Sequence, residues 1–150
     1  MEVAMPRAQR TVLIRRPVGE VFAFFADPSH DQQWRPHVRE IGAPGPLQEG
    51  TIVHQVVAGP GGRRIPADLR ITGYEPAARY AFDVIAGPVR PQGEFLFTPV
   101  AEGTDVSFSL EAELSGPKKW LLGRPVQRSM DSEVAGLDKA RQIIESGTTT

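Results

Sequence analysis

The sequence offers few residues whose type and spacing suggest catalysis. His30, His37 and His54 are its only histidines, no two of them are four residues apart, and cysteine is absent. Thiolate ligands are therefore excluded and no two imidazoles share a helical face, so we expect no metal site. The glycine motifs that bind phosphate and the serine and zinc motifs of hydrolases do not occur. The sequence therefore predicts no cofactor.

Three residues on predicted strands could still take part in acid–base chemistry. His54 lies in the middle of a strand, and an imidazole with a pKa near neutrality is a candidate general base if it faces a cavity. Tyr80 is a candidate phenolic donor and Arg70 a candidate charged partner. The structural alternative is that Tyr80 packs with its hydroxyl in water while His54 and Arg70 face solvent. Glu94 and Glu111 are expected to point outward, which leaves no pair of carboxylates for acid–base work.

A larger set of apolar residues could line a pocket for a small molecule. Such pockets are typically apolar cavities with few polar groups. Core filling is the alternative for every member of the set, and Trp34 could equally stack on a ligand or wedge between the short helices and the sheet. The candidate ligand-binding residues are Trp34, Leu69, Ile71, Tyr80, Phe82, Phe95, Phe97, Phe108, Leu110, Trp120, Leu121 and Met130.

The hydrophobic pattern predicts the elements that would hold these residues. A strand over 9–15 is followed by short helices over 18–26, with Pro17 at the first turn, and over 30–35. Helical spacing of apolar residues predicts a long helix over 126–146, with Pro125 in its first turn and Gly147 as its stop. Between them, alternation and turn signals predict six strands, over 38–43, 51–58, 65–74, 79–85, 93–100 and 105–114.

This order of elements predicts the architecture. Consecutive strands joined by short turns favour an antiparallel sheet. In the last strand Val106, Phe108 and Leu110 alternate with polar residues, so one face of the sheet is wet and the other buried. The helix over 126–146 is the only long amphipathic element that could cover the buried face. We therefore predict an α+β fold, in which a curved seven-stranded antiparallel sheet wraps around the C-terminal helix.

Composition excludes several classes of protein. The chain has 150 residues, 40% of them hydrophobic, and 17 Lys and Arg against 18 Asp and Glu give a net charge of −1. A near-neutral chain lacks the basic footprint of a nucleic-acid partner. No apolar stretch of 18 residues could span a bilayer, and residues 1–10 do not read as a signal peptide. We expect one cytoplasmic domain over 1–150, with its core at about 9–146.

Several short motifs together resemble a known superfamily. They are residues 14–24 (IRRPVGEVFAF), Asp27 and Pro28 with Trp34, residues 74–76 (YEP), and residues 97–100 (FTPV) leading to Gly103 and Thr104. In this order they resemble the START/SRPBCC superfamily, and within it the bacterial polyketide cyclase/dehydrase-like proteins. The resemblance implies a helix-grip fold (β-α-α-β6-α). That superfamily includes carriers of lipids and other hydrophobic molecules as well as aromatase/cyclases, so the fold alone does not decide the activity.

Three functions remain in competition at this point. The leading hypothesis is that the protein binds a hydrophobic or aromatic small molecule, lipid-like or polyketide-like, between the sheet and the C-terminal helix. The second is a polyketide cyclase or dehydratase that acts on a ligand in the same cavity, with His54, Tyr80 and Arg70 as its candidate catalytic residues. The third is a protein-interaction module or homodimer that uses an apolar patch at 120–122.

Two points of detail stay open in the sequence. The strand over 51–58 is apolar on both faces, so either His54 or Gln55 could face the cavity. Residues 115–124 could form a movable flap in which Trp120 and Leu121 close the pocket, with Gly116 and Gly123 as hinges. The alternative is that this segment forms the first turn of a kinked and immobile helix.

Overall fold

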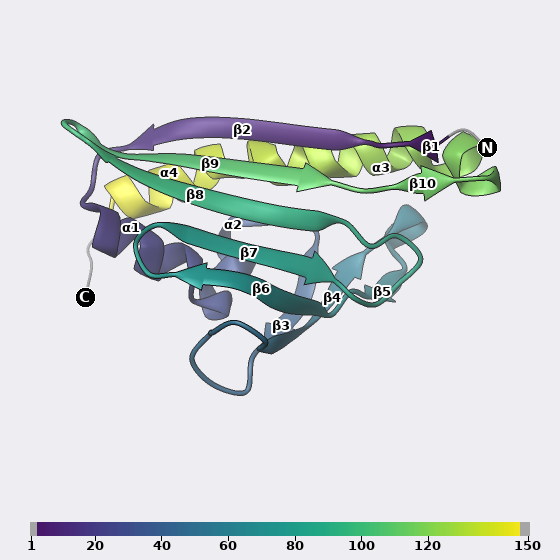
Figure 1. Cartoon of the computed structure of the whole chain (residues 1–150), viewed down its shortest axis with the longest axis horizontal. Helices are drawn as coiled ribbons and strands as arrows, with labels where there is room; N and C mark the ends of the chain where they lie inside the picture. The colour runs from purple at the N-terminus through teal and green to yellow at the C-terminus, as the bar shows by residue number, and fades with distance from the viewer. Residues whose placement is uncertain (1–2, 148–150) are drawn as a thin grey trace.

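The fold is built on a curved antiparallel sheet whose seven main strands lie in the order β2-β9-β8-β7-β6-β4-β3 (Figure 1). The computed structural model describes residues 3–147. Two short pairings lie outside this order: β1 (Val3–Ala4) and β10 (Leu114–Ser115) form a separate two-stranded sheet, and β5 (Arg64–Pro66) pairs with β4. The predicted curved sheet is confirmed. Its main strands are β2 (Arg7–Ile14), β3 (Val38–Gly42), β4 (Ile52–Ala58), β6 (Leu69–Glu75), β7 (Arg79–Val84), β8 (Gln92–Val100) and β9 (Gly103–Glu111).

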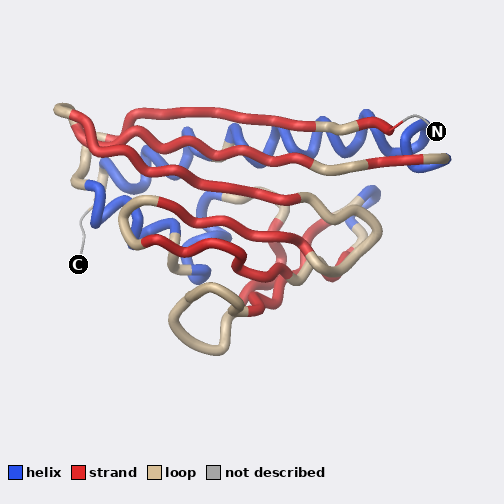
Figure 2. The backbone as a smooth tube through the Cα atoms, in the orientation of Figure 1, coloured by secondary structure: helices blue, strands red, loops and turns tan. Residues whose placement is uncertain are grey.

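The two faces of the sheet have different environments, as alternation predicts. On β9, Val106, Phe108 and Leu110 are buried, whereas Ser107 and Ser109 between them are only half-buried. The long C-terminal helix and the short helices after the first main strand lie on the same side of the sheet, and Figure 2 shows the long helix in blue behind the red strands. We call the face toward the helices the inner face and the opposite one the outer face.

Two predicted strands are shorter in the structure than expected. The strand over 65–74 divides into β5 and β6, since the pairing with β4 shifts between Pro66 and Leu69. The strand over 105–114 ends as β9 at Glu111, and β10 pairs with a different partner. On strand β4 it is Gln55, and not His54, that faces inward. Gln55 is 2% exposed on the inner face, whereas His54 is exposed.

The short helices after β2 cover one end of the inner face. They are α1 (Val18–Phe25), the 3-10 turn η1 (Pro28–His30) and α2 (Asp31–Trp34). Pro17 is the N-cap of α1, one position before its expected place in the first turn. The Asp27 carboxylate accepts hydrogen bonds from the backbone N–H and the hydroxyl of Ser29, which lowers its pKa and starts the 3-10 turn.

The C-terminal helix differs from the prediction at its start and in its middle. Helix α3 (Pro117–Ala135) begins nine residues earlier than expected, and Gly136 separates it from α4 (Leu137–Glu145). Pro125, predicted in the first turn, lies inside α3. Gly116 turns the chain with φ +60, and Pro117 is tolerated as the first helical residue because its missing N–H would be unpaired there. Of residues 115–124, considered as a flap, 117–124 are therefore the first two turns of α3.

Within residues 3–147, no helix combines the length and the apolar character needed to cross a membrane.

Candidate functional site

Aromatic rings from the sheet and from the short helices meet in the space between the sheet and the helices. Phe95 and Phe108 on the inner face stack at 4.1 Å, with an angle of 12° between their planes. Phe25 of α1 lies 5.3 Å from Phe95, and Trp34 of α2 lies about 6 Å from both Phe95 and Phe108, edge to face. These contacts join α1, α2, β8 and β9 in one aromatic layer. Such pairs stabilise by about 0.5–1.5 kcal/mol each beyond the area they bury.

Most of the candidate pocket residues lie in this interior. Trp120 and Leu121 do not: their side chains are 78% and 74% exposed on the surface of α3. The structure thus divides the predicted set into a buried group and an exposed pair. The buried members, none more than 8% exposed, are Trp34, Leu69, Ile71, Tyr80, Phe82, Phe95, Phe97, Phe108, Leu110 and Met130.

The buried side chain of Trp34 has a polar group without a hydrogen-bond partner in the described chain. Its indole Nε1 is buried and has no hydrogen-bond partner among residues 3–147. The opposite edge of the indole faces the junction of α3 and α4, where a Cβ placed on Gly136 would lie 3.1 Å from Trp34 Cε3. The N–H is therefore on the edge that points away from this junction. A buried donor without an acceptor costs about 1–3 kcal/mol.

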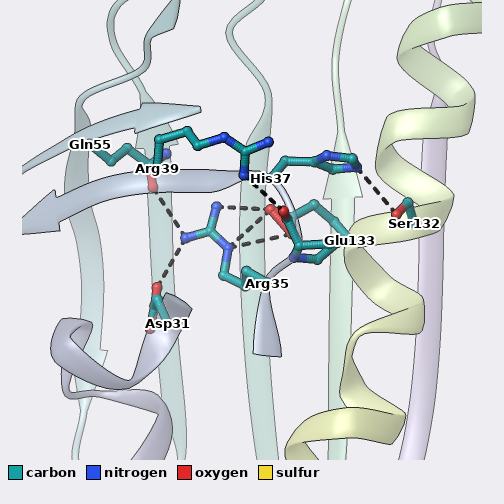
Figure 3. Close-up of polar contacts among 8 residues, drawn as sticks. Asp31, Arg35, His37, Arg39, Gln55, Ser132 and Glu133 are labelled. Atoms are coloured by element: carbon teal, nitrogen blue, oxygen red, sulfur yellow. Dashed lines mark hydrogen bonds and ion pairs between the residues drawn. The ribbon is translucent and has the colours of Figure 1, made fainter. Parts of the chain in front are cut away.

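The residue after Trp34 organises a buried polar cluster. The Arg35 guanidinium, 12% exposed, forms ion pairs with Asp31 at 3.0 Å and with Glu133 of α3 at 2.9 Å. It also donates to Gln55 Oε1 on β4 at 3.1 Å. Figure 3 shows these contacts converging on Arg35 from three elements. The cluster ties α2 to both the sheet and the long helix.

Burial and charge shift the protonation of this cluster and its surroundings. Desolvation raises the pKa of Asp31 to about 6, against the attraction of Arg35. For Arg35, burial lowers the pKa, but Glu133 and Asp31 together raise it further, so the guanidinium stays charged. Tyr80 is buried on the inner face, and its pKa rises chiefly by desolvation and also through the charge of Asp31. Within this cluster, Asp31 thus titrates at about 6, with a protonated phenol nearby.

A hollow of about 360 Å³ opens where α2 meets the junction of α3 and α4. This volume lies within the usual range for small-molecule pockets. Trp34 and Arg35 line it, so it reaches both the aromatic layer and the polar cluster. Beside it, His37 Nε2 lies 3.4 Å from Ser132 Oγ (Figure 3). The lining residues are Gln32, Gln33, Trp34, Arg35, Pro36, Ser132, Ala135, Gly136 and Lys139.

The catalytic residues considered from the sequence do not come together. His54 is exposed on the outer face, where its Nδ1 lies 2.8 Å from Asp68 Oδ1. Arg70 is exposed on the same face, and Tyr80 is buried on the other. A second, open groove of about 520 Å³ follows the outer face. Its lining is mainly polar and includes the ion pair between Arg79 and Glu94 at 2.6 Å.

The polar cluster was not anticipated from the sequence. Its partners come from positions 31, 35, 55 and 133, and only the spacing of Asp31 and Arg35 on one helical turn is a local signal. Glu133 lies on α3, almost a hundred residues after Arg35 in the chain. Only the packing of α2 against α3 brings Glu133 to Arg35.

The matches to known proteins agree with this architecture. The profile of a family described as polyketide cyclase/dehydrase and lipid transport matches residues 5–141. A protein of Thermus thermophilus, TTHA0849, has a similar structure, with a TM-score of 0.76 and 21% identity over 97% of this chain and 100% of that chain. No curated protein matches the chain in sequence.

Two further similar structures are two-domain proteins called ARO/CYC. StfQ, from the steffimycin biosynthetic pathway, has a TM-score of 0.79 and 15% identity over 95% of this chain. BexL, from the BE-7585A biosynthetic pathway, has a TM-score of 0.73 and 16% identity over 97% of this chain. The chain spans about half of each, 51% of StfQ and 50% of BexL.

Proposed function

Because the chain belongs to the polyketide cyclase/dehydrase and lipid transport family, we propose that it binds a hydrophobic or aromatic small molecule between the sheet and the C-terminal helices. The ligand is lipid-like or polyketide-like, and it reaches the interior through the hollow between α2 and the α3–α4 junction. Its rings or chain lie against Trp34, Phe95 and Phe108, the residues that form the aromatic layer.

One observation carries this proposal: the buried indole N–H of Trp34 has no acceptor in the described chain. Native proteins rarely leave such a group unsatisfied, and an acceptor supplied by a ligand removes the penalty. A ligand carbonyl or phenolic oxygen is suitable, because the surrounding walls are apolar rings and the positive charge of Arg35 is held by carboxylates. The site thus favours an aromatic ligand that carries oxygen over a pure hydrocarbon.

The test compares two ligands of similar shape, anthraquinone and anthracene. Binding is followed by the fluorescence of Trp34 in a Trp120→Phe background, since these are the only two tryptophans. We expect anthraquinone to bind roughly five- to tenfold more tightly, equivalent to one hydrogen bond of about 1 kcal/mol. Trp34→Phe, followed by the change in melting temperature, should abolish this preference. Equal affinities in the parent protein, or binding of neither compound, would contradict the proposal.

A cyclase activity is the second candidate, and it rests on the pKa of Asp31. A carboxylate that titrates at about 6 is a competent general base at neutral pH. Asp31 would remove a proton from a carbon between two ligand carbonyls, and the resulting enolate would attack a further carbonyl to close a ring. The protonated phenol of Tyr80 would donate a hydrogen bond to the attacked oxygen.

The test of this activity uses a synthetic linear polyketone thioester. The rate of ring closure should rise with pH around a midpoint of about 6, the pKa of Asp31. In Asp31→Asn the rate and its pH dependence should both be lost. His54→Gln is the matched control, since His54 lies on the outer face and should leave the rate unchanged. If ring closure is no faster than in buffer, the protein binds its ligand without acting on it.

A further inference from the structure

The first half of α3 exposes its largest apolar side chains. Trp120 is 78% exposed and Leu121 is 74% exposed, which makes them by far the most exposed large apolar residues of the described chain. Isolated exposed apolar residues are ordinary on protein surfaces. Here two of them are adjacent in sequence, and one is a tryptophan. The pair therefore calls for an explanation beyond chance.

Basic residues surround this pair on the same helix. Between Glu113 and Asp131 the chain carries Lys118, Lys119, Arg124 and Arg128 and no acidic residue, although its net charge is −1. Arg124 and Arg128 are exposed and form no ion pair with a described residue. Local positive charge is thus concentrated in a protein that is otherwise slightly negative.

Helical spacing places these residues on one surface. Arg124 follows Trp120 by four residues and Leu121 by three, and Arg128 follows Arg124 by four, so all four share one side of the helix. We call these residues, Trp120, Leu121, Arg124 and Arg128, the basic–aromatic face. The second half of α3 carries Met130 and Val134, which are buried in the hydrophobic core.

The basic–aromatic face lies at one end of the molecule. The first turns of α3 extend to the end of the structure where β1 pairs with β10, at the right of Figure 1. The Lys118 ammonium donates to the carbonyl of Pro88 in the loop between β7 and β8, which fixes this end of the helix against the sheet. A projecting end of this kind can approach an extended surface without a clash from the rest of the protein.

We propose that the basic–aromatic face docks the protein on the surface of an anionic lipid membrane. Arginine side chains attract acidic headgroups, while tryptophan and leucine insert at the boundary between headgroups and acyl chains. A second copy of this chain is a poorer partner, because a two-fold contact would bring Arg124 and Arg128 of both copies close together and like charges repel. The docking is independent of whether the interior binds a ligand.

The experiment measures binding of the full chain to vesicles of phosphatidylcholine alone and of equal parts phosphatidylcholine and phosphatidylglycerol. We expect sedimentation only with the anionic vesicles, and weakening as salt is added. Emission from Trp120 should shift to the blue and become protected from iodide, whereas Trp34 is buried and is already shielded. Trp120→Phe should retain binding but lose this spectral change.

Two double variants separate the contribution of charge to vesicle binding from the contribution of the apolar side chains. Arg124→Glu with Arg128→Glu, and separately Trp120→Ala with Leu121→Ala, should each lower vesicle binding roughly tenfold or more. The charge control is Arg15→Glu with Arg39→Glu, which makes the same change in net charge elsewhere on the exposed surface and should bind as the parent does. The proposal is overturned if vesicles are not bound, if neutral vesicles bind equally well, or if the control loses binding too. Sedimentation equilibrium that shows a dimer broken by Trp120→Ala would also overturn it, in favour of a second copy.

Discussion

The junction of α3 and α4 permits a stringent test of the packing, because it depends on a missing side chain. Gly136 has φ −58 and ψ −19, values that alanine adopts freely, so its backbone gives no reason for glycine. Space does. An added Cβ would lie 2.8 Å from the carbonyl oxygen of Trp34, 3.0 Å from that of Glu133 and 3.1 Å from Trp34 Cε3.

The cost of Gly136→Ala follows from these distances. Ordinary contacts between carbon and carbonyl oxygen are about 3.3–3.6 Å, so α2 must move away from the helix by roughly half an ångström. Overpacking of this kind costs about 1–3 kcal/mol. The better helix propensity of alanine returns up to about 1 kcal/mol. The expected net loss is about 1–2 kcal/mol in the free energy of unfolding, which lowers the melting temperature by roughly 3–6 °C.

Gly123 provides the matched control on the same helix. It lies inside α3, and an added Cβ there meets no atom within 4 Å. Gly123→Ala should therefore show only the gain in helix propensity, about 0.5–1 kcal/mol, or a rise of about 2–3 °C. The same substitution thus has opposite effects thirteen residues apart.

The assay is thermal and urea unfolding of the parent and the two variants, followed by circular dichroism. Gly136→Ala should also weaken any ligand held at the hollow, since it pushes Trp34 away from the junction. A neutral or stabilising Gly136→Ala would refute the close approach of α2 to the helix. A destabilising Gly123→Ala would refute the exposed position of the first half of α3.

Three further outcomes follow from buried polar groups. Asp31 has a pKa of about 6 in the folded state, against 3.8 for an ordinary carboxyl. The stability of the parent relative to Asp31→Asn should therefore fall as the pH rises from about 4 to about 6, and then stay level. Urea unfolding across this pH range measures the difference in stability, and a difference that rises with pH would contradict the shift. Arg35→Ala leaves two buried carboxylates without their cation and should cost about 3–5 kcal/mol at neutral pH. Adding Glu133→Gln should recover part of that loss, and a further loss in the double-mutant cycle would show that the pair is not coupled. Thr104 is fully buried and its hydroxyl donates to the carbonyl of Arg16 at 2.9 Å; Thr104→Val should lower stability by about 1–2 kcal/mol in calorimetry, with Thr104→Ser closer to the parent.

The sheet could be predicted because its signals are local. Alternation along residues 105–111 is enough to give a strand with one buried face, and short turns are enough to make its neighbours antiparallel. Only the part of the long helix after residue 125 was predicted. Gly123 and Pro125 indicate a helix boundary in the sequence, but the chain is helical through both residues. A proline inside a helix loses one hydrogen bond and crowds the carbonyl four residues earlier, at a cost of about 3 kcal/mol, so sequence rules place a helix boundary there.

The interior site depends on contacts that no local pattern contains. On β4, Val53 and Val57 share the face of Gln55, and Ile52 and Val56 share the face of His54, so apolar residues do not decide which face is inward. Pairing with β3 and β6 decides it, and Gln55 then meets Arg35. The sequence could predict Trp34 as a core residue that contacts other aromatic rings. The sequence could not predict that the indole N–H of Trp34 lacks an acceptor within residues 3–147, because this depends on which groups surround it in the fold.

The position of β2 at the edge of the sheet has a consequence for how the protein is made. Its partner β9 lies roughly a hundred residues later in the chain, so their pairing is among the most distant contacts of the fold. At about 5–20 residues per second, a ribosome needs roughly 5–20 s to produce β9 after β2 has been synthesised. During this interval Val12 and Ile14 have no sheet to join, although hairpins such as β6–β7 can already form. We expect β2 to be the last main strand to acquire protection from hydrogen exchange during refolding, and its apolar residues to be the segment that a nascent-chain chaperone contacts longest.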